Sequence, residues 1–192
     1  MRVFEKGLVL IAMLSILLRL MLVPGSTFFL ALSSVVLACT YVVFSFALLN
    51  GIRLRDIFKK AAYAGVSASN ILGAIFTGFA LFLACLAIVF GILFWPGREI
   101  VLFFSFPPCL VVLIISIVKL PGAHRDFYVR ILTRVPVAAA LCLFLLLFPR
   151  KTLVEILFRD RPTLIEAINN AMDNPRDVEL QKKKNEEFHK HR

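Results

Sequence analysis

Long uncharged runs separated by short basic stretches make up most of this chain. Five of the runs approach the length of about 20 apolar residues that an α-helix needs to cross the hydrocarbon core of a bilayer. They predict helices over residues 7–23, 28–49, 66–95, 100–118 and 131–148. Short breaks between long apolar helices are typical of antiparallel hairpins. We therefore expect an all-α fold, a polytopic membrane helix bundle over residues 1–149.

The last apolar run leaves the number of crossings open. Val135 to Phe148 is short for a crossing and becomes long enough only when residues 131–134 are included. A four-crossing arrangement would place nearly all basic residues on one side, as the positive-inside rule favours. However, this run has no polar face, which a helix lying on the membrane surface requires. We therefore predict five crossings and a tail on the opposite side from the N-terminus.

Proline-glycine pairs stand between consecutive apolar runs. Proline ends a helix and glycine accepts a positive φ, so each pair predicts a turn that folds the next helix back. The turn residues are Pro24, Gly25, Pro96 and Gly97. Residues 17–26 and 90–98 align with each other around these pairs, which indicates an internal repeat of hairpins. A degenerate third copy surrounds Pro121 and Gly122.

The third apolar run carries small residues at helical spacing. They are Gly65, Ser69, Gly73 and Thr77, with Gly78 one position further on. Small side chains let helices approach closely, and such packing is a main source of helix association in lipid. We expect this face to pack against the second helix through Ser33, Ser34 and Ala38. A second copy of the chain or a partner protein is the alternative.

The segment from Gly73 to Gly97 resembles the transmembrane hairpin of the GldL family, gliding-motility proteins of the type IX secretion machinery. The resemblance rests on residues 73–78 and on residues 91–97, which end in the Trp-Pro-Gly turn. It would imply a proton-driven motor, which needs an intramembrane carboxylate. No Asp or Glu lies between Asp56 and Glu99, or between Glu99 and Asp126. We therefore do not expect motor activity.

Composition and charge support the membrane assignment. Of the 192 residues, 60% are hydrophobic and 18% charged, which is outside the balance of soluble domains. The net charge of +10 comes from basic residues that flank the apolar runs, so it predicts topology and not nucleic-acid binding. Segments 50–69 and 119–134 are both basic, and we expect them to be loops on the cytoplasmic side, together with the N-terminus. A bacterial inner membrane is the expected location.

Polar residues inside the runs are few. Arg19 is the one full charge well inside a predicted crossing, where it either extends toward the interface or contacts a lipid headgroup. His124, Arg125 and Asp126 form a possible catalytic group in a loop, but no nucleophile accompanies them at a known spacing. The cysteines lie singly in separate runs, without metal-ligand spacing. We expect no cofactor, no metal and no enzymatic activity.

Two further segments have recognisable local signals. Pro107-Pro108 interrupts the fourth run and predicts a kink. Residues 150–192 are rich in charges of both signs and predict a soluble tail of short helices. Capping boxes at Thr152 and Thr163 and a cap at Asn174 would start these helices. The tail is either solvated or a docking element.

These features favour a non-enzymatic scaffold or accessory subunit of a membrane complex. Its expected contacts are membrane lipids and a protein partner or second copy, through the third helix or the tail. The alternative is a small membrane transporter or channel, favoured by the repeated hairpins and by the Pro107-Pro108 interruption, since irregular backbone at membrane depth can line a cavity.

Overall fold

The computed structural model describes residues 2–23, 25–95, 97–122, 124–174 and 176–189. These residues form helices joined by short turns, with no strand among them. The first five α-helices are α1 (Arg2–Leu20), α2 (Ser26–Asn50), α3 (Ala68–Leu93), α4 (Arg98–Lys119) and α5 (Arg125–Leu132). The others are α6 (Val135–Leu147), α7 (Arg150–Leu157), α8 (Pro162–Asp173) and α9 (Val178–His189). Two 3-10 turns, η1 (Leu54–Asp56) and η2 (Lys60–Tyr63), lie between α2 and α3.

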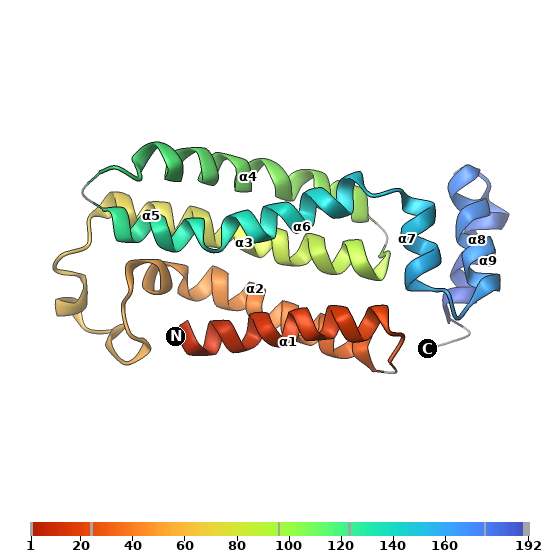
Figure 1. Ribbon diagram of the computed structural model, residues 1–192, viewed down its shortest axis with the longest axis horizontal. Helices are drawn as coiled ribbons and strands as arrows, with labels where there is room; N and C mark the ends of the chain where they lie inside the picture. The colour runs from red at the N-terminus through yellow and green to blue at the C-terminus, as the bar shows by residue number, and fades with distance from the viewer. Residues whose placement is uncertain (1, 24, 96, 123, 175, 190–192) are drawn as a thin grey trace.

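The long helices lie side by side along one axis of the molecule (Figure 1). α2 packs between α1 and α3, and α4 and α6 pack on α3. The loop between α2 and α3 and the start of α5 lie at one end of this bundle, and α7 to α9 lie at the other. The predicted all-α helix bundle is confirmed.

Within the described residues, four segments are long and apolar enough to cross a membrane. They are α2, α3, α4 and the combined segment Arg125–Leu147, which joins α5 to α6. Many large apolar side chains on their outer faces are exposed, among them Phe76, Phe103 and Ile114. A surface of this kind is unfavourable in water and suits lipid. The chain therefore has the structure of an integral membrane protein.

The predicted boundaries of the second, third and fourth helices are close to the observed ones. The predictions 28–49, 66–95 and 100–118 compare with Ser26–Asn50, Ala68–Leu93 and Arg98–Lys119. In these segments nearly all charged residues lie outside the apolar run, so the end of the run and the end of the helix nearly coincide.

The prediction that residues 119–134 form a loop is wrong. α5 begins at Arg125, and its Phe127, Tyr128 and Ile131 are buried in the bundle core. The error arose because Arg130 and Arg134 were assigned to water. Inside the protein these arginines find oxygen partners, so the helix continues into α6 after a short break. The last run, predicted as 131–148, thus belongs to a longer helical segment.

The first helix is shifted from its predicted range of 7–23 to Arg2–Leu20. It lies antiparallel along α2, with Leu8, Val9 and Ile16 against the common core. Because it also carries charged residues at both ends, its composition does not place it among the four apolar segments. The last apolar run is therefore one of the four membrane-length segments, and the first run is not.

The two hairpin turns have the same backbone conformation. Leu22 and Gly25 have φ values of 61° and 81°, and Phe94 and Gly97 have values of 53° and 83°. In each turn an amide bonds to the carbonyl five residues earlier, Val23 to Leu18 and Trp95 to Phe90. This is the Schellman pattern of a helix end. Pro24 and Pro96 lie outside the described residues, and the repeat of whole hairpins stays a prediction.

α4 runs without interruption through Pro107 and Pro108. Because proline has no N–H, the carbonyls of Phe103 and Phe104 lose their usual helical donors. One residue further on, the Cys109 thiol donates to the Ala80 carbonyl at 3.7 Å, which ties this part of α4 to α3. The helix is therefore continuous where the sequence indicated an interruption, and the kink stays a prediction.

The tail is helical, but its helices start elsewhere than predicted. Thr152 and Thr163 lie inside α7 and α8, so the two capping boxes are wrong. At the start of α9, Asp177 Oδ1 accepts from the amides of Glu179 and Leu180, at 2.9 and 3.2 Å, and replaces the predicted cap at Asn174. Proline at the first turn outweighs the Thr-x-x-Glu pattern in α8, because proline cannot follow an earlier helical turn.

The tail also shares the core of the bundle. The buried apolar residues that α7, α8 and their connection add to the common cluster are Leu153, Val154, Leu157, Phe158, Leu164 and Ile168. α7 crosses the end of the bundle and α8 and α9 lie beyond it (Figure 1). The composition changes at residue 149, as the sequence predicts, but apolar packing continues across that position.

Candidate functional site

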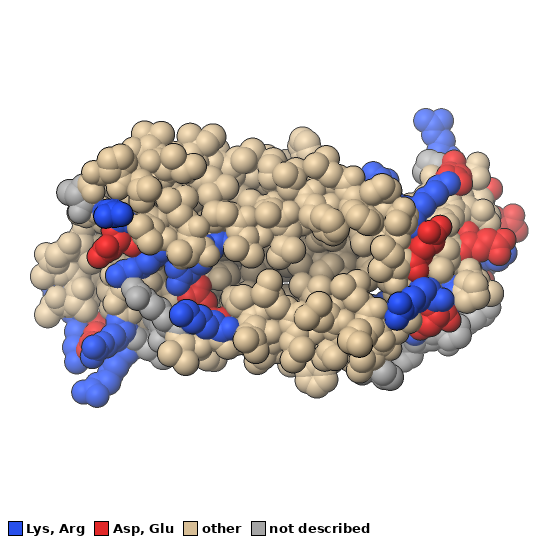
Figure 2. Space-filling view, viewed as in Figure 1, with Lys and Arg blue, Asp and Glu red and all other residues tan. Residues whose placement is uncertain are grey.

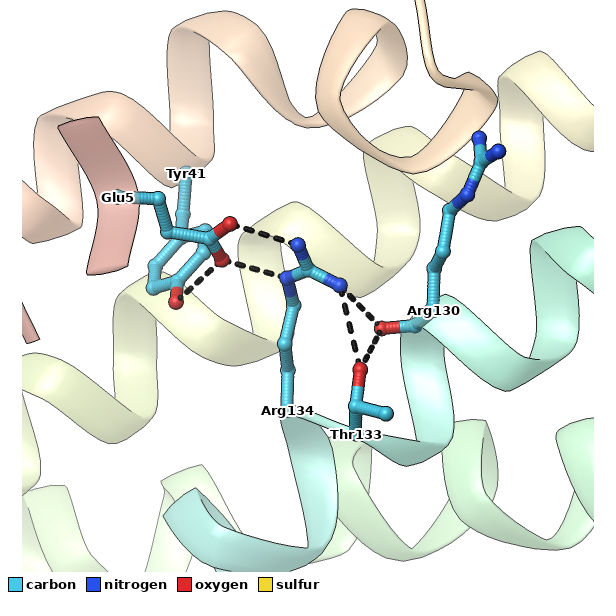
Figure 3. Close-up of polar contacts among 5 residues, drawn as sticks. All are labelled: Glu5, Tyr41, Arg130, Thr133 and Arg134. Atoms are coloured by element: carbon cyan, nitrogen blue, oxygen red, sulfur yellow. Dashed lines mark hydrogen bonds and ion pairs between the residues drawn. The ribbon is translucent and has the colours of Figure 1, made fainter. Parts of the chain in front are cut away.

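A buried ion pair joins the first helix to the last apolar segment. Arg134 donates through Nε to Glu5 Oε1 and through Nη2 to Glu5 Oε2, the latter at 2.6 Å (Figure 3). The Glu5 side chain is 5% exposed and that of Arg134 is 14% exposed. An interaction in which a guanidinium binds a carboxylate through two parallel hydrogen bonds is strong and has a well-defined geometry. The pair therefore fixes the position of α1 relative to the α5–α6 segment.

Further hydrogen bonds extend this cluster to neighbouring helices. Tyr41 of α2 donates its hydroxyl to Glu5 Oε1 at 3.1 Å. Arg134 Nη1 donates to the Arg130 carbonyl at 2.6 Å, and Arg130 Nη1 in turn donates to the Leu49 carbonyl at 3.0 Å. Thr133 donates to the same Arg130 carbonyl at 3.0 Å (Figure 3). The cluster thus links α1, α2 and the α5–α6 segment.

Tyr41 and Arg134, which bind Glu5, lie well inside segments that are long and apolar enough to cross a membrane. Tyr41 is nine residues before the end of α2, and Arg134 is nine residues after the start of the apolar segment Arg125–Leu147. At about 1.5 Å per residue, both positions are about 13 Å from the basic end of their helices. The hydrocarbon core is about 30 Å thick, so an unpaired charge at this depth would be strongly destabilising.

Sequence reasoning missed this cluster. Glu5 was taken as part of the flank before the first crossing, and Arg134 as the end of a basic loop that overlaps the start of the predicted helix 131–148. One signal was available, because Glu5 is the only acidic residue before Asp56 in an otherwise basic N-terminal part. An isolated acid of this kind next to an apolar run is a candidate partner for a buried arginine.

Arg19 lies at the opposite end of the bundle, against the tail. Its guanidinium carbon is 5.1 Å from the centre of the Phe158 ring. Phe158 packs edge-on against Phe94, at 6.0 Å between centres, and Arg98 lies over Phe94 at 4.4 Å. Arg98 Nη2 also donates to the Leu145 carbonyl at 2.8 Å. This chain of cation–π and ring contacts connects α1, the α3–α4 turn and the end of α7, and the predicted headgroup contact of Arg19 stays a prediction.

The small residues of α3 divide into two groups. Thr77 and Gly78 are buried, and a Cβ atom on Gly78 would overlap Ser45 and the Tyr41 carbonyl of α2. Gly73 faces the Phe127 ring of α5. Gly65 precedes the helix, and a Cβ atom there would meet nothing within 4 Å, while Ser69 is exposed in the first turn.

The closest contact of α3 with α2 at Gly78 is with Tyr41 and Ser45. Packing through Ser33, Ser34 and Ala38 stays a prediction. The two helices are antiparallel and joined by the loop after Asn50, so residues at equal distance from that loop face each other. Gly78 is ten residues into α3, and its partners are five to nine residues before the end of α2.

No model of a known protein family, no curated protein and no solved structure is significantly similar to this chain. The resemblance of residues 73–97 to the GldL hairpin therefore stays a prediction. What the protein does has to be inferred from the geometry of its own residues.

Proposed function

We propose that this chain is a non-enzymatic integral membrane protein that acts as a scaffold or accessory subunit of a membrane complex. The observation that carries this proposal is the Glu5–Arg134 cluster. Both carboxylate oxygens of Glu5 accept hydrogen bonds, and all three guanidinium nitrogens of Arg134 donate them. A polar group that binds this many partners within its own chain favours a fixed contact between helices.

The proposed topology has five crossings, with α1 as the first. Pairing with Arg134 offsets the cost of burying Glu5, and the contact with Phe158 accommodates Arg19 at the other end. Basic residues of the loop between α2 and α3 favour the cytoplasmic side for that end of the bundle. The N-terminus would then be cytoplasmic in a bacterial inner membrane, and the tail would lie on the opposite side.

The tail is the proposed site of contact with a partner. The third helix offers less free surface, because Gly73 and Gly78 already contact Phe127 and α2 within the chain. α9 presents exposed Lys182, Lys183 and Glu186. It is held to α8 by a hydrogen bond from Gln181 Nε2 to the Ala171 carbonyl at 3.1 Å. A charged, folded element at the end of the bundle suits a partner of mixed charge, while lipids cover the apolar sides.

Purification in a mild detergent tests this proposal. We expect the tagged chain to elute in a complex of defined stoichiometry, measured by light scattering, with the partner identified by mass spectrometry. Lys182→Glu with Lys183→Glu should release the partner, whereas the matched pair Arg55→Glu with Lys60→Glu at the other end should retain it. A chain that is monomeric and accompanied only by lipid would contradict a scaffold function.

A small transporter or channel is the second candidate, favoured by one observation. Ionisable residues at membrane depth often mark an ion or proton pathway, and Glu5 and Arg134 lie at such a depth. The transporter hypothesis predicts ion or proton flux into liposomes that contain the purified chain. Glu5→Gln, or Pro107→Ala with Pro108→Ala, should abolish that flux. Equal flux in empty liposomes and in liposomes with the chain would exclude this function.

A further inference from the structure

A polar cavity of about 420 Å³ opens at the basic end of the bundle. It lies where α2 ends and where α3 and α5 begin. Its polar and charged lining residues are Asn50, Asn70, His124, Arg125, Asp126 and Arg130. We call it the basic cavity. The His124-Arg125-Asp126 group, considered by itself in the sequence, lies around one space with Asn70 and Arg130.

The lining of the basic cavity suits an anion. Arg125 and Arg130 are cations, and Asp126 is the one acid among the lining residues. His124 and Arg125 are exposed, so their donors can reach a ligand. Arginine donors and amide N–H groups are the usual partners of phosphate oxygens, because guanidinium matches their geometry.

A second cavity, of about 470 Å³, adjoins the first and extends the basic surface. The two cavities share Asn50, and the second is lined also by Arg53, Asp56 and Lys59. Lys59 pairs with Asp56 at 2.8 Å, while Arg53 is exposed. Figure 2 shows Lys and Arg side chains gathered at this end of the molecule, next to the uncharged middle of the bundle.

One large apolar side chain stands within this basic loop. Phe58 is 98% exposed and lies beside Lys59 and Lys60. A fully exposed phenylalanine is unfavourable in water. Flanked by basic residues, it matches the surface segments that enter the interfacial zone of an anionic bilayer.

The cavity also lies at the right level for lipid phosphates. The apolar segments that border it end or begin at Asn50, Ala68 and Arg125. The headgroup layer is directly outside the hydrocarbon core, so the polar ends of crossing helices lie within it. Arg125, at the first position of its segment, therefore faces phosphate groups of the surrounding leaflet.

We propose that the basic cavity and the loop around Phe58 bind the phosphate of an anionic phospholipid from the leaflet at this end. The group that binds is the phosphodiester of the lipid, which carries one negative charge. Arg125 and His124 donate to the phosphate, and Phe58 enters the interface beside it. An acidic protein segment would satisfy the cations but not the apolar side chain at headgroup level. This inference requires membrane insertion, and it holds for a scaffold as well as for a transporter.

Lipid binding to the purified full chain tests the proposal. Native mass spectrometry in detergent compares phosphatidylglycerol, phosphatidylcholine, glycerol 3-phosphate and inorganic phosphate as ligands. We expect the wild type to prefer phosphatidylglycerol to phosphatidylcholine. Arg125→Gln should weaken phosphatidylglycerol binding about fivefold, the effect of one basic residue near an anionic surface. Arg159→Gln, which removes one exposed charge at the opposite end, should leave binding unchanged.

The outcomes separate the possible ligands. Equal affinity for glycerol 3-phosphate and phosphatidylglycerol would keep the phosphate site but assign it to a soluble phosphate, which overturns the lipid assignment. An unchanged lipid preference in Arg125→Gln would overturn the site itself. The lipid site would also be overturned if Arg125→Gln abolished the binding of an acidic protein and left lipid binding unchanged.

A second variant tests the position of Phe58 without depending on affinity. Phe58→Trp in vesicles of phosphatidylglycerol and phosphatidylcholine should add a blue-shifted emission component to that of the wild type, whose Trp95 lies at the α3–α4 turn. In vesicles of phosphatidylcholine alone the added component should lie at longer wavelength. An added component typical of water in both vesicle types would contradict insertion of the loop.

Discussion

At the scale of single residues, one buried ion pair joins two helical segments in an apolar setting. Glu5 and Arg134 bind each other through two hydrogen bonds, and the resulting cluster includes Tyr41. In a medium of low dielectric an attraction between opposite charges is strong, but each charge alone is costly. The stability of the bundle is therefore more sensitive to loss of one partner than to loss of both.

Replacing Glu5 alone should be strongly destabilising. Glu5→Gln leaves the Arg134 charge buried without a counter-charge, and we expect a loss of about 3–5 kcal/mol in unfolding free energy, typical of a broken buried pair. Unfolding in mixed detergent micelles, followed by circular dichroism, measures it. The double variant Glu5→Leu with Arg134→Met should recover most of this loss. If Glu5→Gln unfolds like the wild type, the pair is not formed in the membrane.

The Glu5–Arg134 pair could not be predicted from the sequence. Hydropathy treats every arginine and glutamate as a residue for water, so Glu5 was placed before the first crossing and Arg134 at the basic start of the last one. Only their pairing across 129 positions of the chain makes burial possible, and no local pattern encodes that pairing. Gly78, in contrast, was identified from spacing alone as a packing residue, although its partners on α2 were not.

At the scale of elements, α2 and α3 form the central pair of the bundle. Gly78 is the point at which the backbone of α3 comes close to α2, with Ser45 and the Tyr41 carbonyl in the space of a Cβ atom. Close approach of this kind gives the dispersion contacts that hold helices together in lipid. An added methyl group at this point must move one helix away from the other.

Gly78→Ala should therefore destabilise the bundle. We expect a loss of about 1–3 kcal/mol, the range for overpacking a well-packed core. Gly7→Ala in α1 is the matched control, because a Cβ atom there meets nothing within 4 Å. That change should be neutral or stabilising by up to about 1 kcal/mol, since alanine favours a helix. Equal effects of the two substitutions would exclude close packing at Gly78.

The junction of α7 with the bundle gives a second prediction at this scale. Phe158 is 3% exposed and lies between Arg19 and Phe94. Phe158→Ala removes that ring. A core Phe→Ala change lowers the unfolding free energy by about 3–5 kcal/mol, so the substitution should loosen the tail. Trypsin should then cut at Arg159 at a higher rate. Phe104→Ala, at a side chain that is 64% exposed, serves as control and should leave the cleavage rate unchanged.

The ends of the helices could be predicted only where the charged residues of the sequence are also the exposed residues of the structure. α2, α3 and α4 follow their apolar runs within two residues at nearly every boundary. α5 does not, because Arg130, and Arg134 just after the helix, donate to oxygen atoms of the protein. In the tail, Leu153 and Leu157 look like the apolar side of a surface helix, and their burial depends on the end of the bundle that receives α7.

At the scale of the whole molecule, the two ends differ in chemistry. One end carries the basic cavity and the loop with Phe58, and the other carries the three tail helices (Figure 1). The helices between them alternate in direction, so the side of the tail relative to the loop follows from α3, α4 and the α5–α6 segment alone. The side of the N-terminus depends on α1 and therefore on the Glu5–Arg134 pair.

Sided labelling of introduced cysteines tests the five-crossing topology most directly. In a Cys39→Ala background, the reporter positions Val3→Cys, Lys60→Cys and Lys183→Cys are treated in intact cells and in lysed cells with a maleimide that does not cross membranes. The five-crossing topology predicts that Val3→Cys and Lys60→Cys are labelled only after lysis, and that Lys183→Cys is labelled in intact cells. Labelling of Val3→Cys from the same side as Lys183→Cys would contradict it, because α1 would then lie outside the membrane.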